Sequence, residues 1–302
     1  MPTTASRPVL GVTALAVLLA VNTGCSADPG QSGSDSKVLE GLAALAHGNS
    51  ANLVTYLDAA KAQELSKGNR IRVGSFGQPA SGLLNTHEPP PWGEALKVTQ
   101  IDTAVDTNTA GHWEGSFDAS AITASLKSNG YKQSADGETW TRSGSKGVVM
   151  SLKISNDEIS YTARDASMAA VTPKDGNSLA DKKEYRRVAE CLGEVYRADF
   201  LPLTPAKPVH LSAVGQQAAS AAKNTEVLCA VAKDDATADR AAAKLRSVVA
   251  DESPKFDGTE VTVEKGDQPI VRAAVPDTGT QRPGRLMISN MELLMAVISS
   301  DL

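Results

Sequence analysis

One order of elements occurs twice along this chain, and it constrains the fold more than any other feature. In its first occurrence an alternating run at 113–117 precedes Asp118, a stretch with Ile122 and Leu126 on one helical face, and further alternating runs between 139 and 163. Aspartate favours the N-cap of a helix, and period-two alternation indicates strands. This part of the chain therefore predicts a β-α-β-β unit.

The second occurrence follows a strand expected at 227–231. Asp234 or Asp235 is placed to cap an Ala-rich helix, and the runs at 260–264 and 270–275 predict a hairpin. A short strand at 286–288 and a helix capped by Asn290 are expected to end the chain. Phe117-Asp118-Ala119-Ser120-Ala121 aligns with Asp234-Asp235-Ala236-Thr237-Ala238, which indicates an internal duplication. We expect an α+β fold of two β-α-β-β type (ferredoxin-like) halves, with mainly antiparallel sheets and helices on one face.

Composition describes a foldable chain and excludes some partners. Hydrophobic residues make up 41% and charged residues 22% of the 302 residues, which is typical of a globular protein. The aromatic content of 4% argues against a long aromatic-lined groove for carbohydrate or nucleic acid. A formal net charge of −5 is a poor basis for attracting phosphate backbones. We expect no nucleic-acid partner.

The first residues have the pattern of an export signal. Arg7 precedes an apolar run at 9–21, which is shorter than the roughly 20 residues that a membrane-spanning helix needs. Small residues follow the run, and Cys25 comes directly after Gly24.

This ending resembles the lipobox of bacterial lipoproteins, with a departure at Asn22, where the family prefers an apolar residue. The resemblance implies cleavage before Cys25, lipidation of its sulfur and anchoring at the outer face of the cell membrane. Two alternatives stay open: ordinary secretion with Cys25 as a free thiol, and a retained N-terminal anchor. The two-part layout behind the lipobox also resembles uncharacterised surface lipoproteins of actinobacteria, which implies a compartment and no activity.

Composition shifts divide the chain into five segments. The signal peptide is assigned to 1–24, and the Gly- and Ser-rich stretch at 25–36 predicts a flexible tether. A first α+β domain is expected at 37–165 and a second at 179–302. The Pro- and Gly-containing stretch at 166–178 is the expected linker.

Cys191 and Cys229 remain once Cys25 is assigned to the anchor. In an exported chain they favour a disulfide, which would join the helix around 185–195 to the strand at 227–231. The alternative is a pair of unbonded cysteines that pack as small apolar groups.

Motifs for cofactor or metal chemistry are not assembled in the sequence. The four histidines are scattered, and none stands four residues from another as zinc binding on a helix requires. Residues 106–111 begin like a calcium loop with Asp106 and Gly111, but Phe117 occupies the position of the required glutamate. We therefore expect no metal, no cofactor and no enzymatic activity.

A proline-rich stretch is the candidate docking loop for a partner. His87, Pro90 and Trp92 lie in or beside three successive prolines, which favour an extended loop with an aromatic anchor. The alternative is that Trp92 folds back onto the core. A basic cluster at 182–187 could contact lipid phosphates or an acidic partner, although a solvated helix face is the favoured interpretation.

These patterns together predict a membrane-anchored, non-catalytic binding or accessory module. The membrane is its expected partner through the lipid anchor, together with an envelope protein or a small-molecule ligand. The alternatives are a cell-envelope hydrolase with a site formed by dispersed residues, and a solute-binding lipoprotein of a transporter.

Overall fold

A computed structural model describes residues 36–68, 74–81, 83–84, 92–143, 149–163, 166–220, 222–299 and 302. The chain separates into two compact units, residues 1–34 and 35–302, and the described residues belong to the second. The predicted signal peptide, Cys25 and nearly all of the predicted tether therefore lie outside the described residues.

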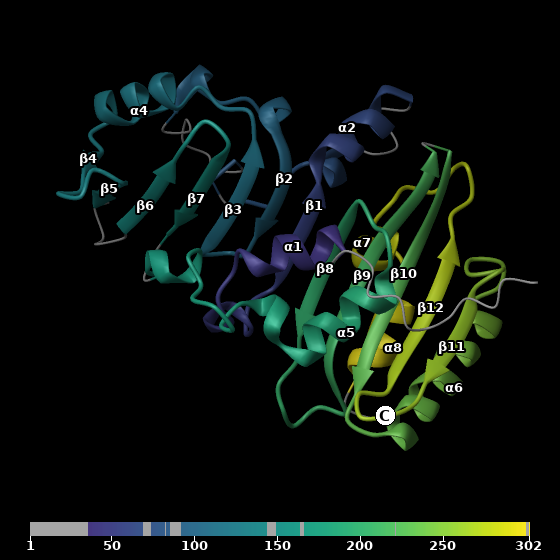
Figure 1. The fold of residues 1–302 in the computed structure, drawn as a ribbon. Coiled ribbons are helices and arrows are strands. Elements are labelled where there is room, and N and C mark those ends of the chain that lie inside the picture. Colours follow the sequence, from purple (N-terminus) through teal and green to yellow (C-terminus); the bar gives the residue numbers. More distant parts are fainter. Residues whose placement is uncertain are drawn as a thin grey trace, which may run out of the picture. The chain divides into compact units, whose positions relative to one another are not determined.

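The second unit is built on one 12-stranded sheet with helices packed against it (Figure 1). Its strands are β1 Val54–Asp58, β2 Ile101–Asp106, β3 Ala110–Gly115, β4 Lys132–Gln133, β5 Thr139–Ser143, β6 Val149–Ile154, β7 Glu158–Thr162, β8 Arg197–Pro202, β9 Val209–Ser220, β10 Lys223–Ala232, β11 Glu260–Glu264 and β12 Ile270–Pro276. Its helices are α1 Lys37–Ala43, α2 Ala59–Gly68, α4 Ala119–Ser128, α5 Lys183–Leu192, α6 Asp235–Asp251, α7 Arg285–Ile288 and α8 Glu292–Ile298.

All neighbouring strands of the sheet pair antiparallel, in the order β11-β12-β10-β9-β8-β1-β2-β3-β7-β6-β5-β4. The predicted α+β class with antiparallel pairing is confirmed. β1 and β8 join the two halves, with Thr55 opposite Asp199. Strands from the two predicted domains thus share one sheet, and their division into separate domains stays a prediction.

Each half begins with three antiparallel strands and a helix, followed by four strands, β4–β7, in the first half and by the β11–β12 hairpin in the second. β1-β2-β3 and β8-β9-β10 are meanders, α4 and α6 follow them, and the last strand of each half, β7 or β12, returns to pair with the third. The expected β-α-β-β order corresponds to the second part of this course. It missed β8 and β9, and the ferredoxin-like description of each half stays a proposal.

The two central helices are capped as the sequence predicts. Asp118 Oδ1 accepts a hydrogen bond from the Ala121 amide at 2.9 Å, and Asp234 Oδ1 accepts one from the Thr237 amide at 2.7 Å. Each bond satisfies an amide that the first turn of a helix leaves unpaired. Asp118 and Asp234 are therefore equivalent, one position away from the alignment made on sequence alone.

Helices cover both faces of the sheet, which corrects the expectation of helices on one face. α1 and α5 pack over Tyr56 and Val227, whereas α4 packs over Trp113 and α6 and α8 pack over Leu228. In Figure 1, α5 lies in front of the sheet and α6 and α8 lie behind it. The reason is that every residue of 227–232 is buried, so the central strands need apolar cover on both sides.

The C-terminal segment differs from its prediction in two respects. Residues 286–288 belong to helix α7 and not to a strand, and α8 begins after Met291 without a side-chain cap from Asn290. The amides of Arg285 and Leu286 donate to the Glu226 carboxylate at 2.9 and 3.2 Å. A buried carboxylate thus holds the first turn of α7, an arrangement that no local sequence signal announces.

The predicted disulfide between Cys191 and Cys229 is confirmed. The two cysteines are 38 residues apart, on α5 and β10 respectively. The bond therefore joins the first helix of the second half to the third strand of its meander.

A row of buried polar side chains crosses the sheet where the two halves meet. Thr55 Oγ1 donates to Asp199 Oδ1 at 2.8 Å, and Arg197 donates to both oxygens of Asp199 at 2.8 and 2.9 Å. The Arg197 guanidinium also lies 4.0 Å from the centre of the Phe76 ring and donates to the Phe76 carbonyl. One buried ion pair thereby fixes the segment at 74–77 on the joint between the halves.

Each half adds one buried carboxyl group to this row. Asp106 Oδ1 accepts from Trp113 Nε1 at 2.9 Å and from the Tyr161 hydroxyl at 2.7 Å, while its Oδ2 has no hydrogen-bond partner among the described residues. Burial raises the pKa of Asp106 to about 6. Gly111 lies between these groups, and a Cβ there would be 2.4 Å from both Asp106 and Tyr161. A side chain at position 111 would therefore collide with Asp106 and Tyr161, and glycine leaves room for their contact.

Glu226 is the corresponding group of the second half. Besides the two amides of α7, its carboxylate accepts from Gln216 Nε2 at 3.0 Å. Burial, together with the nearby charge of Asp277, raises the pKa of Glu226 to about 7. Arg285 donates to Asp277 at 2.8 Å, which keeps that second carboxylate paired.

Candidate functional site

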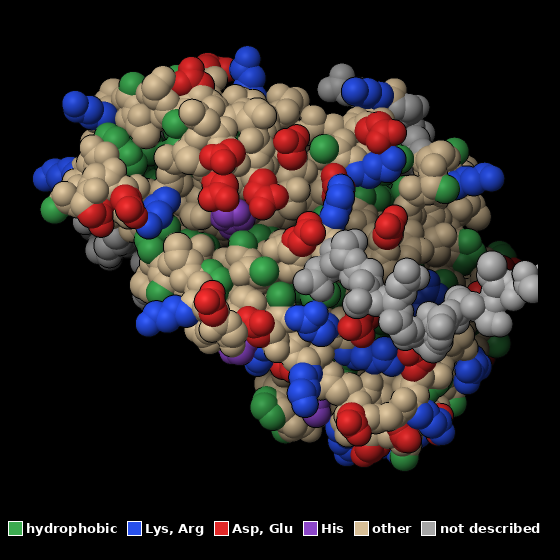
Figure 2. All heavy atoms as spheres, viewed as in Figure 1, with side chains coloured by type: hydrophobic (Ala, Val, Ile, Leu, Met, Phe, Trp, Pro, Cys, Tyr) green, Lys and Arg blue, Asp and Glu red, His purple; other side chains and the backbone are tan. Residues whose placement is uncertain are grey.

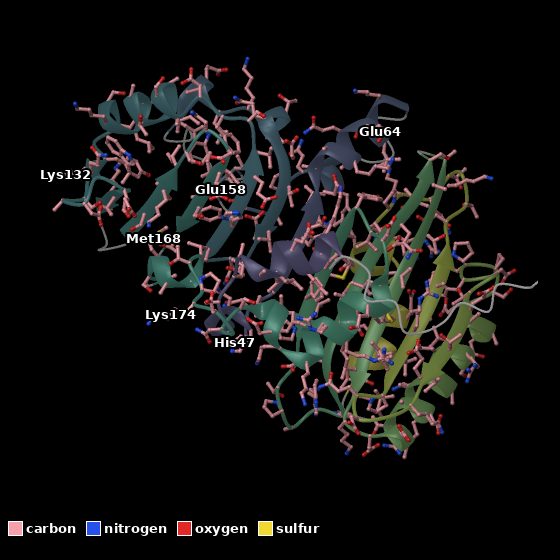
Figure 3. All side chains as sticks on the ribbon, in the orientation of Figure 1. His47, Glu64, Lys132, Glu158, Met168 and Lys174 are labelled. Carbon is pink, nitrogen blue, oxygen red and sulfur yellow. A yellow bond between two sulfur atoms is a disulfide. The ribbon has the colours of Figure 1, made fainter. Side chains whose placement is uncertain are left out.

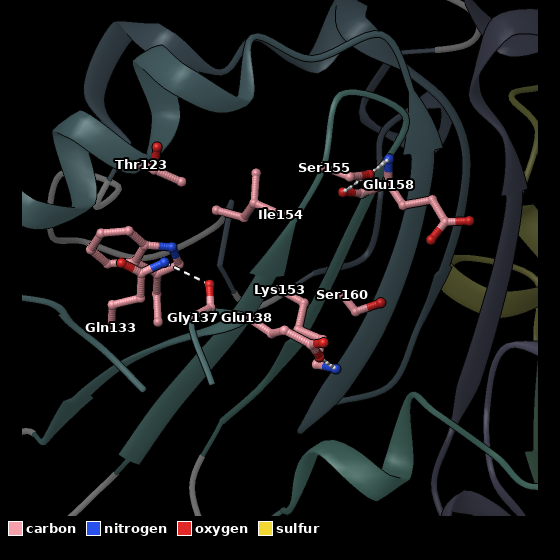
Figure 4. Close-up of a pocket in the computed structure, with 10 residues that line it drawn as sticks. Thr123, Gln133, Gly137, Glu138, Lys153, Ile154, Ser155, Glu158 and Ser160 are labelled. Atoms are coloured by element: carbon pink, nitrogen blue, oxygen red, sulfur yellow. Dashed lines mark hydrogen bonds and ion pairs between the residues drawn. The ribbon is translucent and has the colours of Figure 1, made fainter. Parts of the chain in front are cut away.

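The candidate site is a notch at the end of the first half, where neighbouring strands stop at different positions. The β5–β6 pairing ends at Thr139 opposite Lys153, whereas the β6–β7 pairing continues to Ile154 opposite Ile159. The chain before β5 forms the turn at 134–138 that connects it to the edge strand β4, and a pocket of about 380 Å³ opens there (Figure 4). An unequal strand ending thus creates a recess in an otherwise continuous sheet.

The turn at 133–138 forms one wall of the notch and is held by its own hydrogen bonds. Asp136 Oδ1 accepts from the Glu138 amide at 2.9 Å and from the Ser134 hydroxyl, which holds the pKa of Asp136 below its usual value. Gln133 Nε2 donates to the Gly137 carbonyl at 2.6 Å, and Gly137 has a φ of 78°. Glycine adopts this conformation at little cost. The wall is therefore ordered without a ligand.

Charged groups of both signs line the notch. Glu138 and Lys153 form an ion pair at 2.7 Å, with side chains that are 65% and 37% exposed. A pair this exposed contributes at most about 1 kcal/mol to stability, so its main effect is to position the two groups. Glu158 lies at the start of β7, and Lys132 lies on β4 at the far edge of the sheet (Figure 3).

Trp140 is the tryptophan that lines the notch. It lies on β5 opposite Leu152 and packs against the apolar cluster of the first half, but it is only partly buried. The other two tryptophans, Trp92 and Trp113, are 2% and 0% exposed. An indole with one side on the core and another on solvent can offer an apolar surface to a ligand.

A serine and a histidine meet beside the notch on the open face of the sheet. Ser160 Oγ lies 2.9 Å from His112 Nδ1, and His112 Nε2 lies 3.9 Å from a Glu114 carboxylate oxygen. When Ser160 donates to Nδ1, the proton on Nε2 faces Glu114. This is the order of groups in a nucleophile–base–acid relay. However, β7 pairs with β3 on one side and β6 on the other, so the amides beside Ser160 are committed to the sheet.

The surface around these groups is acidic. Figure 2 shows Asp and Glu side chains gathered over β3 and β7. Glu114 is 59% exposed, and Glu158 is also exposed. A negative surface of this kind raises the local concentration of cations and repels anions.

The sequence-predicted docking loop is described only at its end. His87 and Pro90 lie outside the described residues. Trp92 is buried, and its ring contacts that of Trp113 edge to face at a centroid distance of 6.1 Å. The alternative in which Trp92 folds onto the core is the one observed, so Trp92 does not serve as an exposed anchor.

The basic cluster lines a shallow groove between α5 and the β11–β12 turn, with a volume of about 360 Å³. Arg187 donates to Glu264 at 2.6 Å and to the Gln268 carbonyl at 3.3 Å, and Lys265 pairs with Asp239. The Arg187 contacts connect α5 to the hairpin, the Lys265 pair connects the hairpin to α6, and both use positive charge internally. The cluster matches the solvated-face interpretation more closely than an anion site.

No group of three or more His, Cys, Asp or Glu side chains within the described residues is placed to hold a metal ion. No helix in that part of the chain has the length and apolar character to span a membrane. Comparison of the chain with protein-family models, curated proteins and solved structures finds no match.

Proposed function

We propose that this chain is an exported, lipid-anchored binding or accessory module at the outer face of the cell membrane, and that it takes a small polar ligand in the notch beside β5. The notch carries the proposal, because its polar groups are held in place by one another without a ligand. Preorganised groups lose little freedom on binding. Lipidation of Cys25 remains the sequence-based part of the proposal, and the Cys191–Cys229 disulfide is compatible with an oxidising compartment.

The anchor is tested by fractionating cells that express the chain or its Cys25→Ala variant. The unchanged chain should sediment with membranes and carry the mass of a lipid, and the variant should lose the lipid. An N-terminal peptide of the unchanged chain with the mass expected for an unmodified Cys25 would refute lipidation.

The binding function is tested by a thermal-shift screen of neutral, cationic and anionic small molecules. A ligand of the notch should raise the melting temperature in a dose-dependent manner, and Glu138→Gln with Gln133→Ala should remove the shift. Control substitutions at Lys61 and Glu64, an exposed ion pair on α2, should leave the shift unchanged. If no compound shifts the melting temperature, or if every shift survives in the notch variants, the notch is not a binding site.

The envelope-hydrolase alternative is favoured by one observation, the Ser160–His112–Glu114 series. Catalysis by Ser160 would also need donors for an oxyanion, and its neighbouring amides already pair within the sheet. We therefore place it second. Hydrolysis of activated esters that disappears in Ser160→Ala would reverse this order.

The transporter-receptor alternative needs two lobes that close around a solute, whereas β1 and β8 join the halves in one sheet. We rank it third. We also propose that each half is a ferredoxin-like β-α-β-β unit. In this proposal the two halves are duplicates, and α4 and α6 are equivalent helices.

A further inference from the structure

We infer that the notch binds a neutral, hydroxyl-rich ring, that is, one unit of a saccharide, with the ring face on Trp140 and the hydroxyl groups on the charged rim. The inference rests on the proposed binding function and specifies its ligand class. It depends on three properties of the notch: its charge, its indole and its size.

The charges of the notch select against charged ligands. Glu138 and Glu158 line it together with Lys153, and further acidic side chains lie over β3 and β7 (Figure 2). Repulsion from the carboxylates disfavours an anion. A cation would have to displace or approach the Lys153 ammonium, which already lies 2.7 Å from Glu138. A neutral ligand avoids both costs.

The same groups suit hydroxyls, which donate and accept at once. The exposed carboxylates can accept hydrogen bonds from hydroxyl groups, and hydrogen bonds to ionised groups are stronger than those between neutral ones. The Lys153 ammonium has three donors, of which the ion pair with Glu138 uses one. The side-chain amide of Gln133 donates a hydrogen bond to the Gly137 carbonyl, and its side-chain carbonyl oxygen can accept one from a ligand. Neighbouring hydroxyls on one ring can use the donor and the acceptor of the Lys153–Glu138 pair, which lie 2.7 Å apart.

Trp140 supplies the apolar complement. A saccharide ring presents its C–H groups on its faces and its hydroxyls at its edge, so it can cover an indole without burying a polar group unpaired. The notch, at about 380 Å³, is near the lower limit of small-molecule sites. Its one indole also agrees with an aromatic content of 4%, which excludes a long aromatic groove but not a site for one or two rings.

Intrinsic fluorescence tests the inference directly, because Trp140 is the partly exposed tryptophan of the three. The full chain with Cys25→Ala is titrated with methyl glycosides of glucose, mannose, galactose and N-acetylglucosamine and with maltose and cellobiose. Glucose 6-phosphate and glucosamine serve as the anionic and cationic probes. We expect at least one neutral sugar to give a saturable change, and Trp140→Phe to show that the change comes from Trp140.

Variants then locate the site. Glu138→Gln and Gln133→Ala alter exposed side chains and should weaken binding about fivefold to tenfold. Trp140→Ala should weaken it about tenfold, measured by saturation-transfer NMR on the sugar, since this variant lacks the reporter. Arg187→Ala, in the groove beside α5, is the matched control and should leave affinity unchanged.

The outcomes separate the inference from the proposed function. If a charged probe or another small molecule binds in the notch more tightly than every neutral sugar, the saccharide inference is wrong and the binding function stands. If a sugar binds equally well to the Trp140 and Glu138 variants, the inference is also wrong. If neither the sugars nor the thermal-shift library bind, both fail together.

Discussion

The two halves of the sheet share one course of strands and helices but differ in what covers them. In the second half, α5 covers one face, the disulfide ties it to β10, and the 17-residue α6 packs with α8 on the other face. In the first half, the 10-residue α4 covers one face, while the opposite face over β3, β7 and β6 carries exposed charged side chains. We call the second half closed, because helices cover both faces of its sheet. We call the first half open, because its face over β3, β7 and β6 is exposed to solvent.

This difference shows how one scaffold can separate stability from binding. In the half that contains the disulfide, the basic groove is tied by internal ion pairs. The other half adds the edge strands β4 and β5, and their early ending creates the notch. Four experiments probe this comparison.

The joint between the halves should be the most sensitive position. Arg197→Ala leaves the Asp199 carboxylate buried without its partner and should lower the free energy of unfolding by about 3–5 kcal/mol. Denaturant unfolding measures the change. Arg187→Ala removes an exposed ion pair and should cost about 1 kcal/mol or less. Equal losses in the two variants would mean that the buried Arg197–Asp199 pair contributes no more to stability than an exposed ion pair.

Removal of the disulfide should weaken the closed half. With Cys191 and Cys229 both replaced by alanine, the chain-entropy model gives a loss of about 3–4 kcal/mol. Hydrogen exchange should then show faster exchange in α5 than in α4, because the bond constrains only the second half. An equal increase of exchange in α4 and α5 would contradict the expectation that the disulfide stabilises only the second half.

The pH dependence of stability should report the two buried carboxyl groups. Both pKa values are raised, to about 6 for Asp106 and about 7 for Glu226, so the folded state binds protons that the unfolded chain releases. Stability should therefore fall as pH rises from about 4 to 7, by up to about 1.4 kcal/mol per pH unit for each group, and level off above.

Asp106→Asn should flatten the lower part of this profile and Glu226→Gln the upper part. Glu64→Gln, at an exposed carboxylate, is the control and should leave the slope unchanged. A wild-type profile that rises between pH 4 and 7 would show that other groups dominate the linkage.

The helix caps should be equivalent in the two halves. Asp118→Ala and Asp234→Ala each remove one side-chain bond to an amide of the first turn and should each cost about 1 kcal/mol. Thermal unfolding compares them with Asp235→Ala, at the neighbouring position that the sequence offered as an alternative cap. A larger loss for Asp235 than for Asp234 would reverse the assignment.

Local signals predicted the elements that carry them. Asp118 and Asp234 marked helix starts, the alternation at 270–275 marked β12, and two remaining cysteines in a chain with an export signal indicated a disulfide. For the two helix starts, a short stretch of sequence contains the capping interaction itself.

The failures arise where distant residues decide. β8 was missed because Arg197 and Asp199 look like loop residues, and only their mutual pairing and Thr55 make them acceptable in a buried strand. The notch could not be found either, because it depends on where the β5–β6 pairing stops. Trp140, within a run of polar residues, gave no sign that it would line a pocket.

The β1–β8 pairing has a consequence for the order in which the protein can be assembled. β1 needs β8 as its neighbour, and Thr55 lies 144 residues before the Asp199 to which it bonds. During synthesis from the N-terminus, the first meander must wait with one strand edge uncovered until β8 emerges. Exposed strand edges pair with strands of other chains. A chaperone that covers this edge would therefore prevent aggregation at that stage. Because β1 and β8 are far apart in the sequence, the nascent chain exposes the edge of β1 until β8 has been synthesised.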